Sequence, residues 1–340
     1  MKLLPVLLTA LALLGSVQAQ TRDDGRTVAV KPAVAYNAPS VEQWLMRLHA
    51  SAHQSAYVGT FVVTTSHAMS SAKIWHVREG EQQIERVEAL SGVPRSTYRR
   101  NDQVVTYLPQ SRLAITEKRA SLGLFPSLLS QADSSIARFY QLQPVGHDRV
   151  AGFVTDVVEL KARDSLRFGY RIWTTQSTGL VVKLQTLDTF NGVLEQAAFS
   201  ELQLAKPLSW GKLSAMMDDT EGYTVKTPEL MPTSAEHEGW RLRKTVPGFR
   251  SMSCYKHLQA QPETRAGPLQ WVFSDGLASV SLFIETFDAA RHHRTLPQET
   301  FAVGATRMLT RRVGAWRLTV VGEVPVQTLE MFAAGLERKN

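Results

Sequence analysis

The chain has 340 residues, of which 44% are hydrophobic, 20% are charged and 8% are aromatic. These proportions are typical of a globular protein and exclude a largely disordered or fibrous chain. The formal net charge of +7 is spread along the sequence, so it gives no sign of a basic arm for nucleic acid. The single cysteine, Cys254, excludes a disulfide framework within the chain and any site built from several thiolates.

The first 19 residues have the pattern of a secretory signal peptide. Lys2 gives a positive start, residues 3–14 are mostly apolar, and the small residues Val17 and Ala19 mark a cleavage site. Such a run reaches only about 18 Å as a helix, short of the roughly 30 Å of a bilayer core, which disfavours the alternative of a membrane anchor. The sequence therefore predicts a soluble, exported protein with a flexible leader over residues 20–39.

Residues 40–206 are predicted to form one helix followed by a long series of strands. Ser40 and Gln43 have the spacing of a capping box, and apolar residues then recur at helical spacing to about residue 54. From Tyr57 the apolar period changes to two, with polar turns between the runs and a helical insertion at 127–140. We expect a strongly curved antiparallel sheet that is partly closed around helices.

A linker and a second domain are predicted for the rest of the chain. Residues 207–232 contain several prolines and an acidic run, which indicates a linker, and residues 233–340 have the pattern of a small α+β unit. Within that unit, strands are expected at 240–246, 269–273, 279–287 and 315–321, a short irregular strand at 298–302, and a helix from Pro325 to the end. Residues 255–268 and 288–300 otherwise have the character of loops.

Catalytic and metal-binding patterns are weak. His49 and His53 have helical i, i+4 spacing, but the glutamate of a metalloprotease helix is absent, and two solvated histidines are the alternative. Cys254 and His257 have a spacing that permits a nucleophile pair, although a lone buried thiol is the more common case. The sequence contains no nucleophile elbow and no phosphate-binding glycine loop. We therefore predict no enzymatic activity, no cofactor and no metal.

Two other groups of residues are ambiguous. Basic side chains gather at 291–294 and at 95–100, where each group is either a solvated surface or a contact for an acidic partner. Aromatic and aliphatic residues of the first domain either fill its core or line an apolar cleft on the concave face of the sheet. The candidates for such a lipid groove are Phe61, Trp75, Tyr107, Leu124, Phe125, Phe153 and Trp173.

Several strings resemble the MucB/RseB family, and the resemblance extends over residues 40–337. The most specific string is FSDGLASVSLFIE at 273–285. The others are YVGTF at 57–61, IERVEALSGVPR at 84–95, VVTYLP at 104–109, Gly304-Ala305 and TVVGEVP at 319–325.

The resemblance implies a periplasmic negative regulator of an envelope-stress sigma factor. Proteins of this family bind the periplasmic domain of a membrane-spanning anti-sigma factor of the RseA or MucA type and shield it from site-1 proteolysis. The resemblance implies a LolA-like fold for the large domain, an unclosed β-barrel with helices that senses lipid or lipopolysaccharide. It assigns much of the anti-sigma contact to the small α+β domain, and it admits a homo-oligomer because members tend to self-associate.

A turn in the second domain and a basic loop are the predicted partner-binding sites. Gly276 suits a positive φ, so the turn at 274–276 could present a rigid strand, or it is simply the central hairpin of the small core. Bending at the linker would let the domains reorient when lipid binds. The other functions considered are a periplasmic lipid or lipoprotein carrier and, more remotely, a secreted hydrolase. The partner-binding candidates are Ser274, Asp275, Gly276, Leu277, Arg291 and Arg294.

Overall fold

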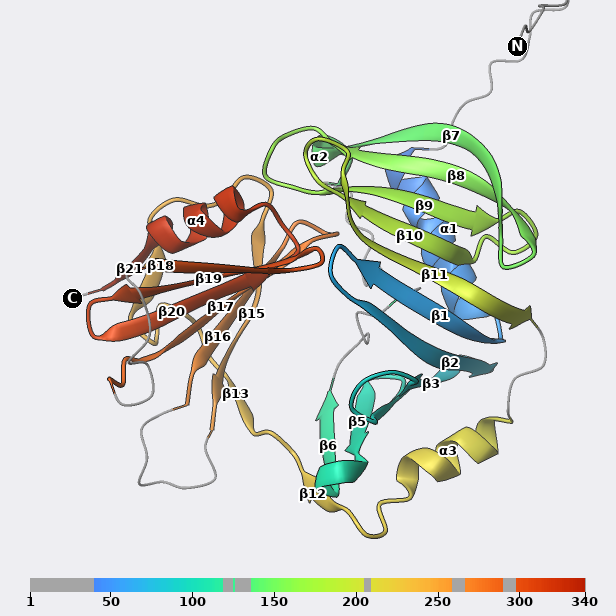
Figure 1. Cartoon of the computed structure of the whole chain (residues 1–340). Helices are drawn as coiled ribbons and strands as arrows, with labels where there is room; N and C mark the ends of the chain where they lie inside the picture. Colours follow the sequence, from blue (N-terminus) through green and yellow to red (C-terminus); the bar gives the residue numbers. More distant parts are fainter. Residues whose placement is uncertain are drawn as a thin grey trace, which may run out of the picture. The chain divides into compact units, whose positions relative to one another are not determined.

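The computed structural model describes residues 40–118, 125, 136–204, 209–258, 267–289 and 298–339 (Figure 1). These residues form a mixed α+β structure with a twelve-stranded and a seven-stranded sheet. The predicted signal peptide and leader, Leu124, Arg291 and Arg294 lie outside the described residues. Within the described ranges, no helix combines the length and apolar character that crossing a bilayer would require.

Helix α1 (Val41–Gln54) begins at the predicted capping box. The Ser40 hydroxyl accepts a hydrogen bond from the Gln43 backbone N–H at 3.2 Å, and the Gln43 side chain accepts one from the Ser40 N–H at 3.2 Å. Both bonds satisfy N–H groups that have no partner inside the helix. The apolar face of α1, which includes Leu45 at 1% exposure, packs against the large sheet. The helix predicted from the sequence is therefore confirmed.

The large sheet is unclosed: among the described residues its first and last strands, β12 and β7, do not pair with each other, and each has one neighbour, β6 and β8 respectively. The order is β12-β6-β5-β4-β3-β2-β1-β11-β10-β9-β8-β7, and only the β12–β6 pair is parallel. The strands are β1 (Tyr57–Thr65), β2 (Met69–Glu79), β3 (Gln82–Ala89), β4 (Ser96–Arg100), β5 (Gln103–Leu108), β6 (Leu113–Lys118), β7 (Tyr140–Val150), β8 (Phe153–Ala162), β9 (Gly169–Thr175), β10 (Val181–Leu187), β11 (Val193–Leu204) and β12 (Thr224–Lys226).

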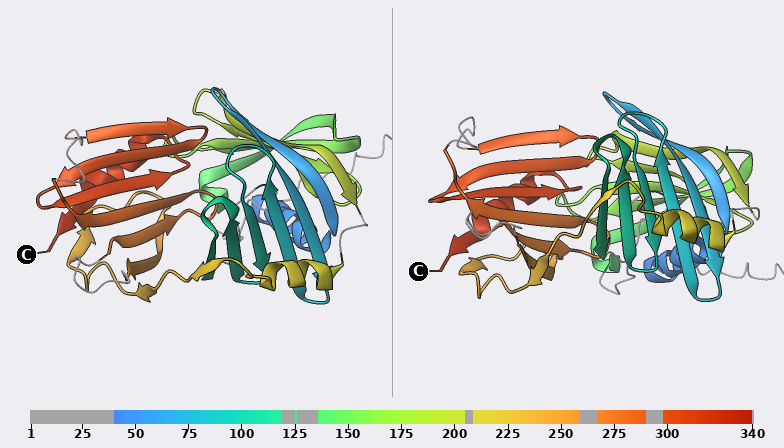
Figure 2. Two further views of the ribbon diagram at one scale, coloured as in Figure 1. Left: turned by 60° about the horizontal axis from the view of Figure 1, so that its bottom comes forward. Right: turned by 90° about the horizontal axis from the view of Figure 1, so that it is seen from below.

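The two faces of this sheet are covered by different helices. Helix α3 (Trp210–Asp218) lies across β2 and β3 (Figure 2) and buries Leu213 and Met217 in one cluster. Helix α1 belongs to a separate cluster on the opposite face, which also contains α2 (Ile136–Phe139). Since successive side chains of a strand point to opposite faces, β2 contributes Ile74 to the α1 side and Val77 to the α3 side. A 3₁₀ turn at Pro109–Ser111 connects β5 and β6.

The small sheet is antiparallel and carries one helix. Helix α4 (Val326–Gly335) packs on β19 (Thr306–Val313) and β20 (Trp316–Gly322). The predicted final helix is present, but Pro325 is its N-cap rather than a residue of its first turn, and it ends at Gly335, so Leu336 lies in a strand instead of in the predicted helical stripe. A separate pair joins β14 (Trp240–Leu242) to β21 (Leu336–Arg338). In sheet order, the strands are β13 (Leu230–Pro232), β15 (Arg250–His257), β16 (Leu269–Ser274), β17 (Ser279–Thr286), β20 (Trp316–Gly322), β19 (Thr306–Val313) and β18 (Gln298–Val303).

The structure corrects several predicted elements. Strands β7, β15 and β19 were not predicted. Strand β7 is largely polar and exposed, β15 carries arginine and lysine, and β19 carries arginines, so none shows a clear apolar alternation. The segment 207–232, predicted as a linker, contains α3, β12 and β13 in its described part, so it adds a strand to each sheet. The predicted strand from residue 240 ends at Leu242 rather than at 246.

Gly59 on β1 provides a test of the packing between β1 and β11. A Cβ atom at this position would lie 2.7 Å from the Glu201 carbonyl oxygen and 2.7 Å from the Phe199 ring. We expect Gly59→Ala to lower the free energy of unfolding by about 1–3 kcal/mol, because the backbone oxygen cannot move away cheaply. Gly211 in α3 is the control, since nothing lies within 4 Å of its added Cβ. Urea unfolding that shows equal stabilities for the two variants would contradict this packing.

Candidate functional site

Four of the predicted groove residues lie together in the interior between α1 and the large sheet. Phe61 and Phe125 are buried with ring centroids 5.5 Å apart, and Phe199 lies 5.0 Å from Phe125. Trp173 is buried in the same cluster, and Phe153 packs against it half-buried. These side chains fill the interior as a core, and an apolar ligand there would have to displace some of them.

Two other groove candidates belong to the opposite face of the sheet. Tyr107 is buried under α3 and donates a hydrogen bond to the Met217 carbonyl at 2.6 Å. Trp75 packs half-buried on the same side, where the Arg86 guanidinium lies 4.7 Å from its ring. The sequence could not separate these residues from the others, because the faces of adjacent strands are fixed by register. The structure therefore divides the predicted groove into two groups.

A ladder of buried polar side chains crosses β1 to β4 on the α1 side. Tyr57, His76, Glu85 and Arg99 occupy directly opposed positions on successive strands. Arg99 Nε donates to Glu85 Oε2 at 2.8 Å, and His76 stacks on Tyr57 with ring centroids 5.2 Å apart. Burial raises the pKa of Tyr57 well above its usual value, and its hydroxyl has no hydrogen-bond partner among the described residues. The interior thus contains one unpaired hydroxyl beside its aromatic core.

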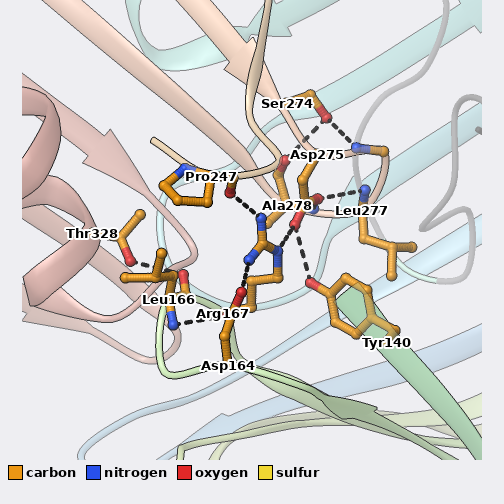
Figure 3. Close-up of polar contacts among 11 residues, drawn as sticks. Tyr140, Asp164, Leu166, Arg167, Pro247, Ser274, Asp275, Leu277, Ala278 and Thr328 are labelled. Atoms are coloured by element: carbon orange, nitrogen blue, oxygen red, sulfur yellow. Dashed lines mark hydrogen bonds and ion pairs between the residues drawn. The ribbon is translucent and has the colours of Figure 1, made fainter. Parts of the chain in front are cut away.

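A buried ion pair joins the large sheet to the small sheet. Arg167, in the loop between β8 and β9, donates from Nε to Asp275 Oδ2 at 2.6 Å, and both side chains have 0% exposure. The same guanidinium contacts the Asp164 carboxylate and the Pro247 carbonyl (Figure 3). Tyr140 donates to Asp275 at 3.4 Å; burial raises its pKa well above the usual range, so the hydroxyl remains protonated. We call Arg167, Asp275, Asp164 and Tyr140 the joint.

At Gly248, beside the joint, the surroundings leave no room for a side chain larger than hydrogen. The Arg167 guanidinium lies 4.1 Å from the centroid of the Phe139 ring and 5.1 Å from that of Phe249. Gly248 has φ +84°, and a Cβ there would lie 2.7 Å from the Phe139 ring and also meet the guanidinium. The position therefore requires glycine for both its backbone angle and its space.

Next to the joint, one leucine of each sheet's connecting loop packs into the hydrophobic core of the other sheet. Leu166 of the β8–β9 loop is buried in the cluster of the small sheet, and its carbonyl accepts a hydrogen bond from Thr328 on α4 at 2.7 Å. Leu277 of the β16–β17 turn packs against the cluster that contains Phe61 and Phe125. The aromatic interior and the turn are therefore in direct contact.

The predicted partner-binding turn is rigid. Asp275 Oδ1 accepts hydrogen bonds from the N–H groups of Leu277 and Ala278 at 2.9 and 2.8 Å, and Ser274 Oγ accepts one from Gly276 at 3.0 Å. Gly276 has φ +101°, as its expected role requires. The Asp275 side chain is fully engaged inside the chain, which leaves Ser274, Gly276 and Leu277 half-buried at the turn. Contact with a partner stays a prediction for these residues.

The alternative chemical sites are not assembled. Cys254 pairs with Trp271 while His257 bonds Gln270 on the other face of the sheet, so their side chains point apart. Burial raises the pKa of the Cys254 thiol to about 11, which keeps it protonated at neutral pH. The described residues contain no group of three His, Cys, Asp or Glu side chains placed to hold a metal, and the His53 side chain lies outside them.

The predicted basic patch at residues 95–100 is also corrected. Arg99 is buried in the polar ladder, whereas Arg100 points to the opposite face and binds the two Asp218 oxygens at 2.7 and 2.9 Å. Arg95 alone remains exposed. Adjacent arginines on one strand cannot share a face, so the sequence spacing already argued against a single patch.

Comparison with known proteins gives a consistent result along both parts of the chain. The model of the MucB/RseB N-terminal domain matches residues 40–217, and that of the C-terminal domain matches residues 234–337. The chain is 28% identical over 306 residues to the sigma factor AlgU regulatory protein MucB of Pseudomonas aeruginosa, covering 89% of this chain and 92% of that protein.

Two solved structures resemble it over a similar extent. The Pseudomonas aeruginosa MucA/MucB complex gives a TM-score of 0.68 at 25% identity, covering 88% of this chain and 99% of that one. A crystal structure of MucB with MucA(peri) gives 0.65 at 26% identity, covering 87% and 98%. The two family models and both structures thus match the same protein class over both parts of the chain. The chain belongs to the MucB/RseB family.

Sequence reasoning missed the half of the joint that comes from the large sheet. Asp275 was singled out, but Arg167 and Tyr140 were not, because neither lies in a motif. The available signal was the placement of Arg167 beside the apolar residues Leu166 and Phe168, which is unusual for an exposed loop.

Removing the charge of Asp275 tests the joint. We expect Asp275→Asn to lower the free energy of unfolding by about 3 kcal/mol, the low end for a broken buried pair, because Arg167 keeps Asp164. The control is Arg241→Ala, which removes an exposed contact to Glu337 and should change stability by less than about 1 kcal/mol. Guanidinium unfolding followed by tryptophan fluorescence measures both. Equal effects would show that the joint contributes no more than a surface pair.

Proposed function

We propose that this protein is a periplasmic regulator that binds the periplasmic domain of a membrane-bound anti-sigma factor of the RseA/MucA type. By occupying that domain it restrains site-1 proteolysis, so the envelope-stress sigma factor stays sequestered. Lipid or lipopolysaccharide acts as the signal that releases the partner. No catalytic step is part of this function.

The observation that carries the proposal is the agreement with MucB over both sheets. The relatives cover nearly the whole described chain, and two of the matching structures are complexes of MucB with MucA. A carrier of lipid between membranes would need only the large sheet, so the match to the second family model favours the regulator. The apolar run at residues 3–14 supports export to the periplasm.

The joint offers a physical route from lipid to partner. A lipid chain entering the aromatic interior must displace side chains of the cluster that Leu277 contacts. Leu277 follows Asp275 in the rigid turn, so its displacement strains the hydrogen bonds that hold the turn and the ion pair to Arg167. Lipid can weaken partner binding only by as much as it prefers the released arrangement.

Calorimetric titration tests the proposed function. The protein is titrated with the periplasmic domain of the cognate anti-sigma factor, with and without lipopolysaccharide fragments. We expect binding that becomes weaker when the fragments are present. Absence of binding in both conditions would refute the regulator, and binding that lipid does not change would refute the lipid signal alone.

Leu277→Ala tests the route through the turn. We expect the variant to bind the partner in the absence of lipid and to lose most of the weakening that lipid causes, since the contact with the aromatic cluster is gone. Leu90→Ala, which truncates a leucine with 51% exposure, is the matched control and should keep the full lipid effect. An unchanged lipid effect in Leu277→Ala would exclude this route.

A further inference from the structure

The turn between β10 and β11 exposes a large aromatic side chain. Phe190 lies at the tip of this hairpin with 91% of its surface exposed, and Val193 at the start of β11 is 50% exposed. Met69, the first residue of β2 after the neighbouring β1–β2 turn, is 74% exposed, and Thr65 at the end of β1 pairs with Glu195 of β11. Exposed apolar side chains are therefore present in the β10–β11 turn and at the adjacent starts of β2 and β11, at the same end of the large sheet.

The tip is held in a fixed conformation. Asp188 Oδ1 accepts hydrogen bonds from the N–H groups of Phe190 at 2.8 Å and Gly192 at 2.7 Å. The Asp188 N–H donates to the Gly192 carbonyl at 2.8 Å, and Asn191 adopts φ +64°. These bonds fix the backbone that carries Phe190, which reduces the loss of backbone order on binding.

A polar cavity of about 310 Å³ lies directly beside this tip. Thr189 and Asn191 of the turn line it together with Lys161 at the end of β8 and Arg163 of the β8–β9 loop. Its other charged residues are Arg167, Glu159, Asp164 and Asp188. Neither Lys161 nor Arg163 has an ion-pair partner among the described residues; Arg163 Nε donates only to the Tyr140 carbonyl at 3.3 Å.

The carboxylates of the cavity are already engaged. Glu159 lies 3.8 Å from Arg171, Asp164 binds Arg167, and Asp188 accepts the N–H groups of the turn. The two unpaired cations, Lys161 and Arg163, are therefore the groups available to a ligand, and their charge suits an anion.

We propose that the β10–β11 hairpin is a membrane-contact surface for anionic phospholipid. In this arrangement Phe190 enters the interfacial region of the bilayer while Lys161 and Arg163 bind lipid phosphates. Aromatic side chains favour the bilayer interface, and each basic side chain near an anionic surface adds attraction. This surface goes beyond the proposed function and does not rest on it.

The shape of the feature favours a membrane over a protein partner. A stable protein interface buries roughly 800 Å² on each side over a broad, complementary patch. Here a narrow hairpin projects one aromatic ring beside a hollow in which Lys161 and Arg163 are the unpaired charges, which matches the depth profile of a bilayer from phosphates to apolar chains.

Vesicle co-sedimentation of the purified protein tests the surface. Vesicles of phosphatidylcholine are compared with vesicles that also contain phosphatidylglycerol, and we expect binding to the anionic vesicles only. Phe190→Ser should weaken binding by roughly tenfold. The double variant Lys161→Gln/Arg163→Gln should bind the anionic vesicles about thirtyfold more weakly. Phe301→Ser is the matched control, because Phe301 is 64% exposed on β18 of the small sheet, and it should bind as the wild type.

Three results would overturn the proposal. They are equal sedimentation with neutral and anionic vesicles, an equal loss in Phe301→Ser and Phe190→Ser, or displacement by inorganic phosphate with no dependence on Phe190. The last would identify a site for free anions instead. Titration of the same variants with the anti-sigma domain separates this surface from the proposed function, since partner binding should not change.

Discussion

The ion pair between Arg167 and Asp275 is the interaction on which the arrangement of the two sheets depends. A guanidinium and a carboxylate with no exposed surface must compensate each other, because each alone would be strongly disfavoured in the interior. Asp275 also holds its own turn through two backbone N–H groups, and Arg167 holds Pro247 and Asp164. One pair of charges therefore fixes a loop of the large sheet and a turn of the small sheet together.

The exchange of leucines adds an apolar constraint to this polar one. Because Leu166 is packed in one core and Leu277 in the other, separating the sheets would expose apolar surface and unpaired charge at the same time. Such a boundary favours two discrete arrangements over gradual bending. The proposed release of a partner on a signal would use that behaviour.

Local patterns in the sequence predicted the parts of the fold that depend on local interactions. The capping box at Ser40 and Gln43, the change to a period of two after Tyr57 and the final helix after Pro325 are all present in the structure. The faces of the strands were less accessible, so Tyr107 and Trp75 were grouped with Phe61 although register places them under α3. Arg167 was missed because its partner lies more than a hundred residues away in the chain, and no local pattern encodes that distance.

The central pairing of the large sheet has a consequence for how the chain reaches its fold. Strand β1 lies between β2, its neighbour in sequence, and β11, the last long strand of the sheet. The α1 core, to which Phe199 of β11 contributes, is therefore incomplete until nearly the whole of the first matched region is present. Pairings so distant in sequence form slowly. With the export that we propose, the chain would emerge N-terminus first. Its aromatic strands would then stay uncovered until β11 follows, and chaperones of the destination compartment would have access to them during that period.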